Sequence, residues 1–477
     1  MSLKKQALSG LIWTFSQQFG TQLINFVIGI ILARVLLPSD FGTIAMFGVV
    51  MSIASSLING GLSSSLIRTQ NVDDKDLSTI FWFNVLASIL IYGIVFITAP
   101  LIAHFYDLPS LTGIIQVFGL VLIPGAFGAV QSIRFVKEMD FKTPFKIQLP
   151  SLIIGGLSGV IFAYKGFGVW SLVYYQLIQA IISNLQFWFY SKWKPSFVFD
   201  RKKFKYHFNF GYKMMLSDLL NSIFKNIYTV VIGKLFSPVE LGYYNRADSL
   251  KQLPVSNLSS ALNSVTFPLF SKLKDNNIKL KDVYRKLMKV VIFIISPVLC
   301  ISVVTAEPLI RFLLSEKWLP AVPYFQILAI SGILYPIHSY NLNILKVKGR
   351  SDLFLKLEII KKALVVLILM VSFKYGVLGI VWGQVFLSVI SFFINTYYSG
   401  KLLHFGSLHQ VLDLVPTLLI SAIITIVCFW FDRQFLINTS DFARLIVVTV
   451  GFSVMYLAAT YALKFKEYNY IKELITK

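Results

Sequence analysis

The sequence predicts an all-α integral membrane protein that crosses a bilayer about fourteen times. Of its 477 residues, 56% are hydrophobic and only 14% are charged, and the mean hydropathy is +0.71. This composition lies outside the range of soluble globular proteins. Apolar stretches of about 20 residues, the length that crosses a bilayer, recur from one end of the chain to the other. A transmembrane β-barrel would instead show alternating segments of roughly ten residues.

Short polar connections separate the predicted spans. The spans cover residues 8–33, 41–66, 78–102, 113–133, 148–164, 168–190, 208–233, 241–270, 288–313, 322–345, 357–373, 377–399, 412–431 and 443–463. The first is interpreted as a retained helix, because residues 9–25 contain Ser, Thr, Gln and Asn and no convincing cleavage site. Cys300 and Cys428 both lie inside apolar runs, so neither a disulfide framework nor a Cys-based metal site is expected. We expect no cofactor.

Lysine and arginine residues concentrate in alternate connections. With Lys4 and Lys5 on the cytoplasmic side, that side also receives Arg68 and Lys75, Arg134 to Lys146, Lys192 to Lys205, Lys272 to Lys289, Lys346 to Lys362, Lys401, and Lys464 to Lys477. Cytoplasmic loops normally carry this excess, which predicts that both termini are cytoplasmic. The net charge of +22 therefore reflects topology and contact with anionic membrane lipids. It does not indicate nucleic-acid binding.

The chain repeats itself at an offset of about 200 residues, as Arg34 and Lys234 illustrate. The matched segments are 33–42 with 233–242, 100–102 with 308–310, and 165–170 with 374–382. This repeat predicts two parallel six-helix lobes, residues 1–200 and 201–402, followed by helices 13 and 14 and a cytoplasmic tail at 403–477. Transporters commonly place the substrate path between such repeats, so a central cavity is expected there.

Polar side chains line one face of four predicted spans. They are Gln18, Thr21, Gln22 and Asn25; Ser52, Ser56, Asn59 and Ser63; Asp218, Asn221, Ser222 and Lys225; and Gln252, Ser256, Ser259 and Asn263. Such residues either join helices through interhelical hydrogen bonds or face a polar cavity. The coincidence of symmetry-related stripes favours the cavity.

The seventh and eighth spans add ionisable residues to these stripes: Lys213, Asp218, Lys225, Arg246, Asp248 and Lys251. A net cationic cavity suits a phosphate or pyrophosphate, which accepts charge-assisted hydrogen bonds. Lys225 and Arg246 are the leading substrate-binding candidates. Lys213 is close enough to a helix end to snorkel, and Lys251 is a weaker candidate. Asp218 shares nearly one face with Lys225 and is expected to compensate part of its charge.

Enzymatic interpretations find no suitable motif. The sequence has no G-x-x-x-x-G-K-[ST] phosphate loop, and its five histidines form no H-E-x-x-H pattern. The acidic pair in Asp74-Lys75-Asp76 is interpreted as part of a solvated loop. Asp40 and Glu240 are predicted to cap the second and eighth helices. A transporter is therefore predicted rather than an enzyme.

Several longer motifs resemble one family. They are Leu241 to Ala247 with Leu253-Pro254, Phe267 to Leu273, Asp76 to Thr79 followed by Phe81-Trp82, Glu307 to Ile310, and Lys317 to Ala321. Together they resemble the Wzx-type polysaccharide flippases, also called lipopolysaccharide or O-antigen translocases. These belong to the superfamily that also holds the multidrug and toxic-compound exporters.

The resemblance implies a flippase of the bacterial inner membrane. Such a protein moves a polyprenyl-pyrophosphate-linked oligosaccharide from the cytoplasmic to the periplasmic face by alternating access, for O-antigen, capsule or exopolysaccharide synthesis. H+ or Na+ coupling stays open, with Asp218 and Asp248 as candidates. A small-solute exporter of the same superfamily is the alternative. It predicts a carboxylate-rich first lobe, whereas residues 8–33 contain no Asp or Glu.

Overall fold

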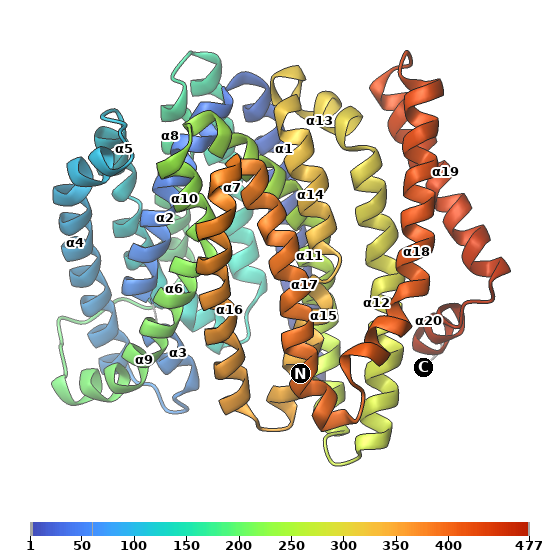
Figure 1. Ribbon diagram of the computed structural model, residues 1–477. Coiled ribbons are helices and arrows are strands. Elements are labelled where there is room, and N and C mark those ends of the chain that lie inside the picture. The colour runs from blue at the N-terminus through green and yellow to red at the C-terminus, as the bar shows by residue number, and fades with distance from the viewer. Residues whose placement is uncertain (1–2, 60, 476–477) are drawn as a thin grey trace. The chain divides into compact units, whose positions relative to one another are not determined.

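The computed structural model describes residues 3–59 and 61–475, and within them all regular structure is helical (Figure 1). The chain divides into two compact units, Met1–Gly242 (unit 1) and Tyr243–Lys477 (unit 2). The predicted lobes, 1–200 and 201–402, concern the internal repeat and stay a prediction.

Unit 1 is a bundle of ten helices. They are α1 (Leu3–Val35), α2 (Pro38–Asn59), α3 (Leu62–Arg68), α4 (Asp74–Phe105), α5 (Leu111–Gly119), α6 (Leu122–Lys137), α7 (Lys142–Tyr164), α8 (Val169–Tyr190), α9 (Arg201–Lys225) and α10 (Ile227–Leu235). Helix α7 packs against α1 and α8, and α4 packs against α5 and α6. Helix α9 lies against α2, α3 and α4, far from it in sequence.

Unit 2 continues the helical pattern. Its helices are α11 (Pro238–Lys272), which begins at the end of unit 1, α12 (Asn277–Val304), α13 (Ala306–Leu314), η1 (Glu316–Ala321), α14 (Val322–Gly332), α15 (Tyr335–Val347), α16 (Ser351–Ser372), η2 (Phe373–Tyr375), α17 (Gly376–Leu403), α18 (Ser407–Phe431), η3 (Asp432–Leu436), α19 (Asp441–Ala462) and α20 (Glu467–Ile475). Its core gathers around the fully buried Tyr284, Phe270 and Tyr340.

All fourteen predicted stretches fall on helical structure, but five contain a break that was not predicted. The stretch 208–233 is interrupted at Asn226, where α9 ends, and the stretch 322–345 at Ile333 and Leu334. The second break precedes Pro336, which has no N–H to donate to the carbonyl of Gly332 four residues earlier.

Within residues 3–59 and 61–475, ten helical segments are long and apolar enough to cross a membrane. One of them, Ser351–Leu403, is 53 residues long and contains two predicted spans, divided at Gly376, whose φ is +73°. The predicted spans 168–190, 208–233 and 241–270 fall outside the ten. These three are rich in polar side chains, so the total of fourteen spans stays a prediction.

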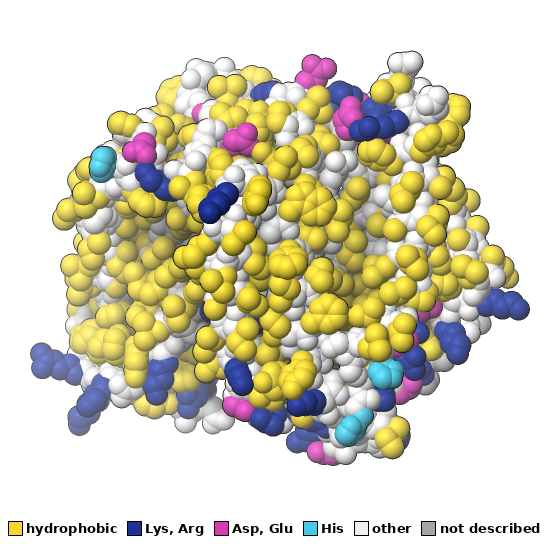
Figure 2. Space-filling model, in the orientation of Figure 1, with side chains coloured by type: hydrophobic (Ala, Val, Ile, Leu, Met, Phe, Trp, Pro, Cys, Tyr) yellow, Lys and Arg dark blue, Asp and Glu magenta, His cyan; other side chains and the backbone are white. Residues whose placement is uncertain are grey.

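Large hydrophobic side chains are exposed along the middle of the helices, as Leu90, Phe386 and Leu419 illustrate with exposed fractions of 59%, 61% and 56%. On the face drawn in Figure 2, hydrophobic side chains predominate and charged ones gather toward helix ends. Water would disfavour this surface and a hydrocarbon layer would accommodate it. The chain is a multi-pass membrane protein.

Candidate functional site

An ionic cluster that is buried at Asp76 and His207 and exposed at Asp73 joins α9 to the start of α4. It consists of Asp73, Asp76, Lys203 and His207, with Ser65 of α3, and we call it the aspartate end of unit 1. The Lys203 ammonium lies 2.7 Å from the Asp73 carboxylate and 2.9 Å from that of Asp76. His207 is fully buried, with Nε2 3.3 Å from Asp76 Oδ1 and Nδ1 2.8 Å from the Ser65 hydroxyl.

Helix capping holds the two aspartates in place. The Asp73 side chain accepts from the Asp76 N–H at 2.9 Å, and the Asp76 side chain accepts from the Asp73 N–H at 3.0 Å. This reciprocal arrangement satisfies backbone donors that the first turn of α4 would otherwise leave unpaired. The carboxylate of Asp76 is thereby fixed where α9 can reach it.

Charge and burial set the protonation states of this cluster. The hydrogen bond from Lys203 holds the pKa of Asp73 well below its usual range. Burial lowers the pKa of His207, and the opposing effect of Asp76 is smaller. Near pH 7 the cluster therefore contains ionised Asp73 paired with Lys203, next to a neutral imidazole.

The extended segment 191–200 is bound to the same motif. Ser78 Oγ accepts from the Ser196 N–H at 3.0 Å, and Thr79 Oγ1 accepts from the Asp200 N–H at 3.0 Å. Trp82 donates to the Ser196 carbonyl at 2.8 Å. These contacts explain why Asp, Ser, Thr and Trp occur together at 76–82.

The interpretation of Asp74-Lys75-Asp76 as a solvated loop was wrong for Asp76, which is only 5% exposed. Its partner His207 is 131 residues away in the sequence, so local pattern could not reveal the burial. The motif at 76–82 was the one sequence signal that could have indicated a structural role for Asp76.

The opposite end of unit 1, which we call the proline end, is built from the two repeated segments 33–42 and 233–242. A Cβ atom placed on Gly42 would lie 1.7 Å from the Pro238 carbonyl oxygen, and one on Gly242 would lie 2.0 Å from that of Pro38. The contact is reciprocal, as for two segments related by a two-fold axis. Only glycine allows so close an approach of backbones.

The predicted cap is confirmed for Asp40 at the proline end, whereas Ser237 provides the cap next to Glu240. The Asp40 carboxylate accepts from the Leu37 N–H at 2.9 Å and caps α2. At α11 the Ser237 hydroxyl accepts from the Glu240 N–H at 3.2 Å. Glu240 lies in the first turn, where a carboxylate interacts favourably with the helix dipole.

The predicted stripe on α9 separates into two kinds of side chain. Ser222 is buried and hydrogen-bonds the hydroxyl of Ser52 on α2, which is the helix-joining role. The side chains of Lys213, Asp218, Asn221 and Lys225 are exposed. No ion pair joins Asp218 to Lys225 among the described residues, so the expected charge compensation between them is not observed.

The stripe on α1 is mixed as well. Gln18 and Asn25 are both exposed. Tyr175 of α8 donates to the Asn25 amide oxygen at 2.8 Å, so Asn25 also helps to join two helices. The side chain of Asn59 lies outside the described residues.

The candidates on α11 lie in unit 2. The Arg246 guanidinium is 5.5 Å from the ring centre of Trp318, which is fully buried. The Lys251 ammonium is 2.6 Å from the Asp248 carboxylate, and Lys251 is only 8% exposed. Lys251 and Asp248 therefore form an ion pair with each other in this conformation.

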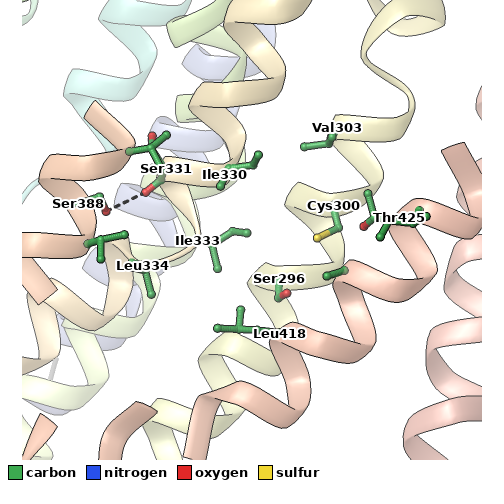
Figure 3. Close-up of a pocket in the computed structure, with 14 residues that line it drawn as sticks. Ser296, Cys300, Val303, Ile330, Ser331, Ile333, Leu334, Ser388, Leu418 and Thr425 are labelled. Atoms are coloured by element: carbon green, nitrogen blue, oxygen red, sulfur yellow. Dashed lines mark hydrogen bonds between the residues drawn. The ribbon is translucent and has the colours of Figure 1, made fainter. Parts of the chain in front are cut away.

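Unit 2 also contains an apolar cavity of about 430 Å³ between α12, α14, α17 and α18 (Figure 3). Three of its hydroxyls bond to backbone carbonyls: Ser331 to Leu328 at 2.7 Å, Ser388 to Ser331 at 3.2 Å, and Thr425 to Ser421 at 2.6 Å. Its lining, which includes Cys300, carries no charge among the described residues.

The chain is a multi-pass helical bundle, and its polar helix α9 exposes the cations Lys213 and Lys225. These are features of a membrane transporter. The chain belongs to the family described as polysaccharide biosynthesis protein, which it matches over residues 31–323. No group of three or more metal-ligating side chains is present among the described residues.

Known proteins support both the family and the fold. The chain is 26% identical over 437 residues to the teichuronic acid biosynthesis protein TuaB of Bacillus subtilis, covering 90% of this chain and 89% of TuaB. It is 26% identical to the succinoglycan biosynthesis transport protein ExoT of Rhizobium meliloti, covering 69% and 67%. The lipid II flippase MurJ in an inward closed conformation shares the fold, with a TM-score of 0.74, 13% identity, and coverage of 95% and 99%.

Proposed function

We propose that this protein is a flippase that moves a polyprenyl-pyrophosphate-linked oligosaccharide from the cytoplasmic to the periplasmic face of the bacterial inner membrane. The family membership, the transport role in the name of ExoT, and the fold shared with a lipid flippase all favour this function. The product would enter surface polysaccharide synthesis. Both termini are placed in the cytoplasm by the distribution of Lys and Arg, and the protein acts as a transporter rather than an enzyme.

The observation that carries the proposal is the exposure of Lys213 and Lys225 on α9. A lysine inside a membrane protein is costly unless it reaches water, a counter-ion or a polar ligand. Neither of these lysines forms an ion pair within the described residues. A pyrophosphate supplies the missing negative charge through charge-assisted hydrogen bonds.

Arg246 remains a candidate for the same role, stacked on Trp318 at 5.5 Å. A guanidinium can pack on an aromatic ring and also bind phosphate oxygens through its N–H groups. Among the polar candidates, Gln18, Asn25, Asn59 and Asn221 supply neutral hydrogen-bonding groups along the path.

The two repeats, residues 1–200 and 201–402, are proposed to move against each other in alternating access. The reciprocal packing of Gly42 and Gly242 supports a two-fold relation between them. If H+ or Na+ drives the cycle, Asp218 is the better candidate, because it is exposed whereas Asp248 already pairs with Lys251.

The decisive experiment measures on which side of the membrane the lipid-linked oligosaccharide lies in cells that lack the protein. Spheroplasts and inverted vesicles are probed with a sugar-directed label. Accumulation on the cytoplasmic face, relieved by restoring the gene, is the expected result. Normal periplasmic exposure would reject the flippase and favour a small-solute exporter.

A further inference from the structure

Unit 1 contains a pocket whose lining includes no residue of α9. It lies between α3, α6 and α8, and its volume is about 460 Å³. Its lining includes the side chains of Ser63, Ser132, Ser183 and Asn184 together with Gly125 and Gly128. The two glycines keep the pocket open where α6 borders it, because they place no side chain in it.

The polar side chains of this pocket have unused hydrogen-bonding capacity. Among the described residues, no hydrogen bond joins Ser63, Ser132, Ser183 or Asn184 to another group of the chain. The Asn184 amide oxygen is buried without a partner. A buried polar atom in this state costs about 1–3 kcal/mol unless a ligand or water satisfies it.

Several serines in other helices of the molecule bond to backbone carbonyls of their own helix. Ser151 donates to the Ile147 carbonyl at 2.7 Å, and Ser56 donates to that of Ser52 at 2.9 Å. In the apolar cavity of unit 2, Ser331 is bonded to the backbone in the same way. Helical serines often satisfy themselves like this, although single hydroxyls such as those of Ser171 and Ser296 also lack a partner. The α3–α6–α8 pocket differs because four unbonded polar side chains border one space, which points to a ligand with many hydroxyls.

The lining also excludes an ionic ligand. None of the described residues that border the pocket carries a charge, so a pyrophosphate would find no counter-ion there. Serine hydroxyls and the asparagine amide both donate and accept hydrogen bonds. This combination matches the hydroxyl groups of a neutral sugar.

The pocket extends from near the middle of the membrane toward the side that is predicted to be cytoplasmic. Along α6, Gly125 lies roughly 18 Å and Ser132 roughly 8 Å from Lys137, the last residue of the helix. Asn184 and Ser63 also lie within two turns of the ends of their helices at Tyr190 and Arg68. A lipid-linked glycan that enters from the cytoplasmic face would meet this pocket early.

We infer that the α3–α6–α8 pocket binds a neutral sugar residue of the transported lipid, separately from the cationic residues that hold its pyrophosphate. The inference rests on the proposed function and adds the part of the substrate that this site recognises. Two subsites for chemically different parts of one molecule allow selection of the glycan independently of the lipid carrier.

The test fills the pocket at Gly125, where an added Cβ meets no atom within 4 Å. Gly125→Phe places a ring in the pocket. Gly93→Phe in α4 is the matched control, because Gly93 is also helical with nothing within 4 Å and does not line the pocket. Asn184→Ala is a milder variant that removes the amide without adding volume.

Binding is measured for two lipids: the lipid-linked oligosaccharide extracted from cells that lack the protein, and bare polyprenyl pyrophosphate. We expect the wild type to bind the glycan-bearing lipid at least tenfold more tightly. Gly125→Phe should abolish this preference while the affinity for the bare lipid stays the same, Asn184→Ala should reduce the preference, and Gly93→Phe should keep it.

Other outcomes are informative. If Gly125→Phe and Asn184→Ala keep the preference for the glycan-bearing lipid, the sugar site is overturned and the flippase proposal stands. The same holds if the wild type binds both lipids equally well. If folded Gly125→Phe loses affinity for both lipids equally, the assignment of the pocket to a sugar is also overturned. A wild type that binds neither lipid would reject the proposed function together with this inference.

Discussion

The two ends of unit 1 join segments that are far apart in the sequence, but they do so with different chemistry. At the proline end, backbones touch through Gly42 and Gly242. At the aspartate end, buried charges and an imidazole join α9 to α4. A backbone contact is independent of pH and salt, whereas a buried ionic cluster is expensive unless every member is paired. We therefore expect changes of pH and salt to weaken the aspartate end more than the proline end.

The largest effect is expected from Asp76→Ala. The substitution removes the partner of Lys203 and His207 and half of the capping box. Lys203 keeps its pair with Asp73, but buried His207 loses a hydrogen-bond partner, which costs about 1–3 kcal/mol, and the lost cap costs about 1 kcal/mol more. Denaturant unfolding of the purified protein in detergent measures this loss.

The control for that prediction is Asp352→Ala, which breaks a pair with Arg350 in which both side chains are largely exposed. Exposed pairs contribute about 0–1 kcal/mol. If both variants unfold at the same denaturant concentration, the aspartate end is not a stabilising cluster.

The next effect is expected at the proline end. Gly42→Ala drives a methyl group into the Pro238 carbonyl, and overpacking of this kind costs about 1–3 kcal/mol. Gly48→Ala in the same helix meets nothing within 4 Å and should stabilise by about 1 kcal/mol, since alanine favours helix more than glycine does.

The same unfolding assay in detergent checks the glycine variants. Gly242→Ala should resemble Gly42→Ala, because its contact with Pro38 is the reciprocal one. Equal stabilities of the Gly42→Ala and Gly48→Ala proteins would contradict the close contact at the proline end.

A third prediction concerns the region between the two ends. Lys225 is exposed on α9 and forms no ion pair within the described residues, so Lys225→Ala should change the free energy of unfolding by less than about 0.5 kcal/mol. Translocation of the lipid-linked oligosaccharide should nevertheless fall about tenfold, the value of one charge-assisted hydrogen bond.

The control for Lys225 is Lys234→Ala, whose ammonium pairs with exposed Asp107 at 2.6 Å. Its transport rate should match the wild type. Wild-type transport by Lys225→Ala, measured as label reaching the glycan in spheroplasts, would remove Lys225 from the substrate path.

The sequence predicted the helices better than the contacts between them. Each predicted stretch is helical, because long apolar runs report directly on membrane burial. The break at Asn226 escaped prediction, since asparagine inside a polar helix carries no strong signal on its own. The exposure of Lys225 follows the predicted stripe, whereas Ser222 and Ser52 turned out to join helices.

The aspartate end shows why the remaining site could not be predicted. His207 lies in a strongly basic stretch, which predicts solvent exposure. Its burial depends on Asp76 and Ser65, which are 131 and 142 residues away. Pairing over such distances is decided by tertiary packing and has no local periodicity.

The smallest predicted effect is a loss of stability on acidification, and it separates the two ends most cleanly. Burial lowers the pKa of His207 in the folded protein, so the unfolded chain binds more protons below its ordinary pKa of about 6.5. Stability from the neutral imidazole is therefore complete above that pH and is lost as the pH falls from there toward the folded pKa.

The groups that face His207 do not reverse this sign. Asp76 raises the pKa of His207, while Lys203 and Lys137 lower it together with burial. Measured between pH 7 and pH 5, the free energy of unfolding should fall more steeply in the wild type than in His207→Gln, which keeps polar contacts without titrating. Gly42→Ala should keep the wild-type slope, because the proline contact involves no proton. Equal slopes in wild type and His207→Gln would mean that another group dominates, and the aspartate end would then be as insensitive to pH as the proline end.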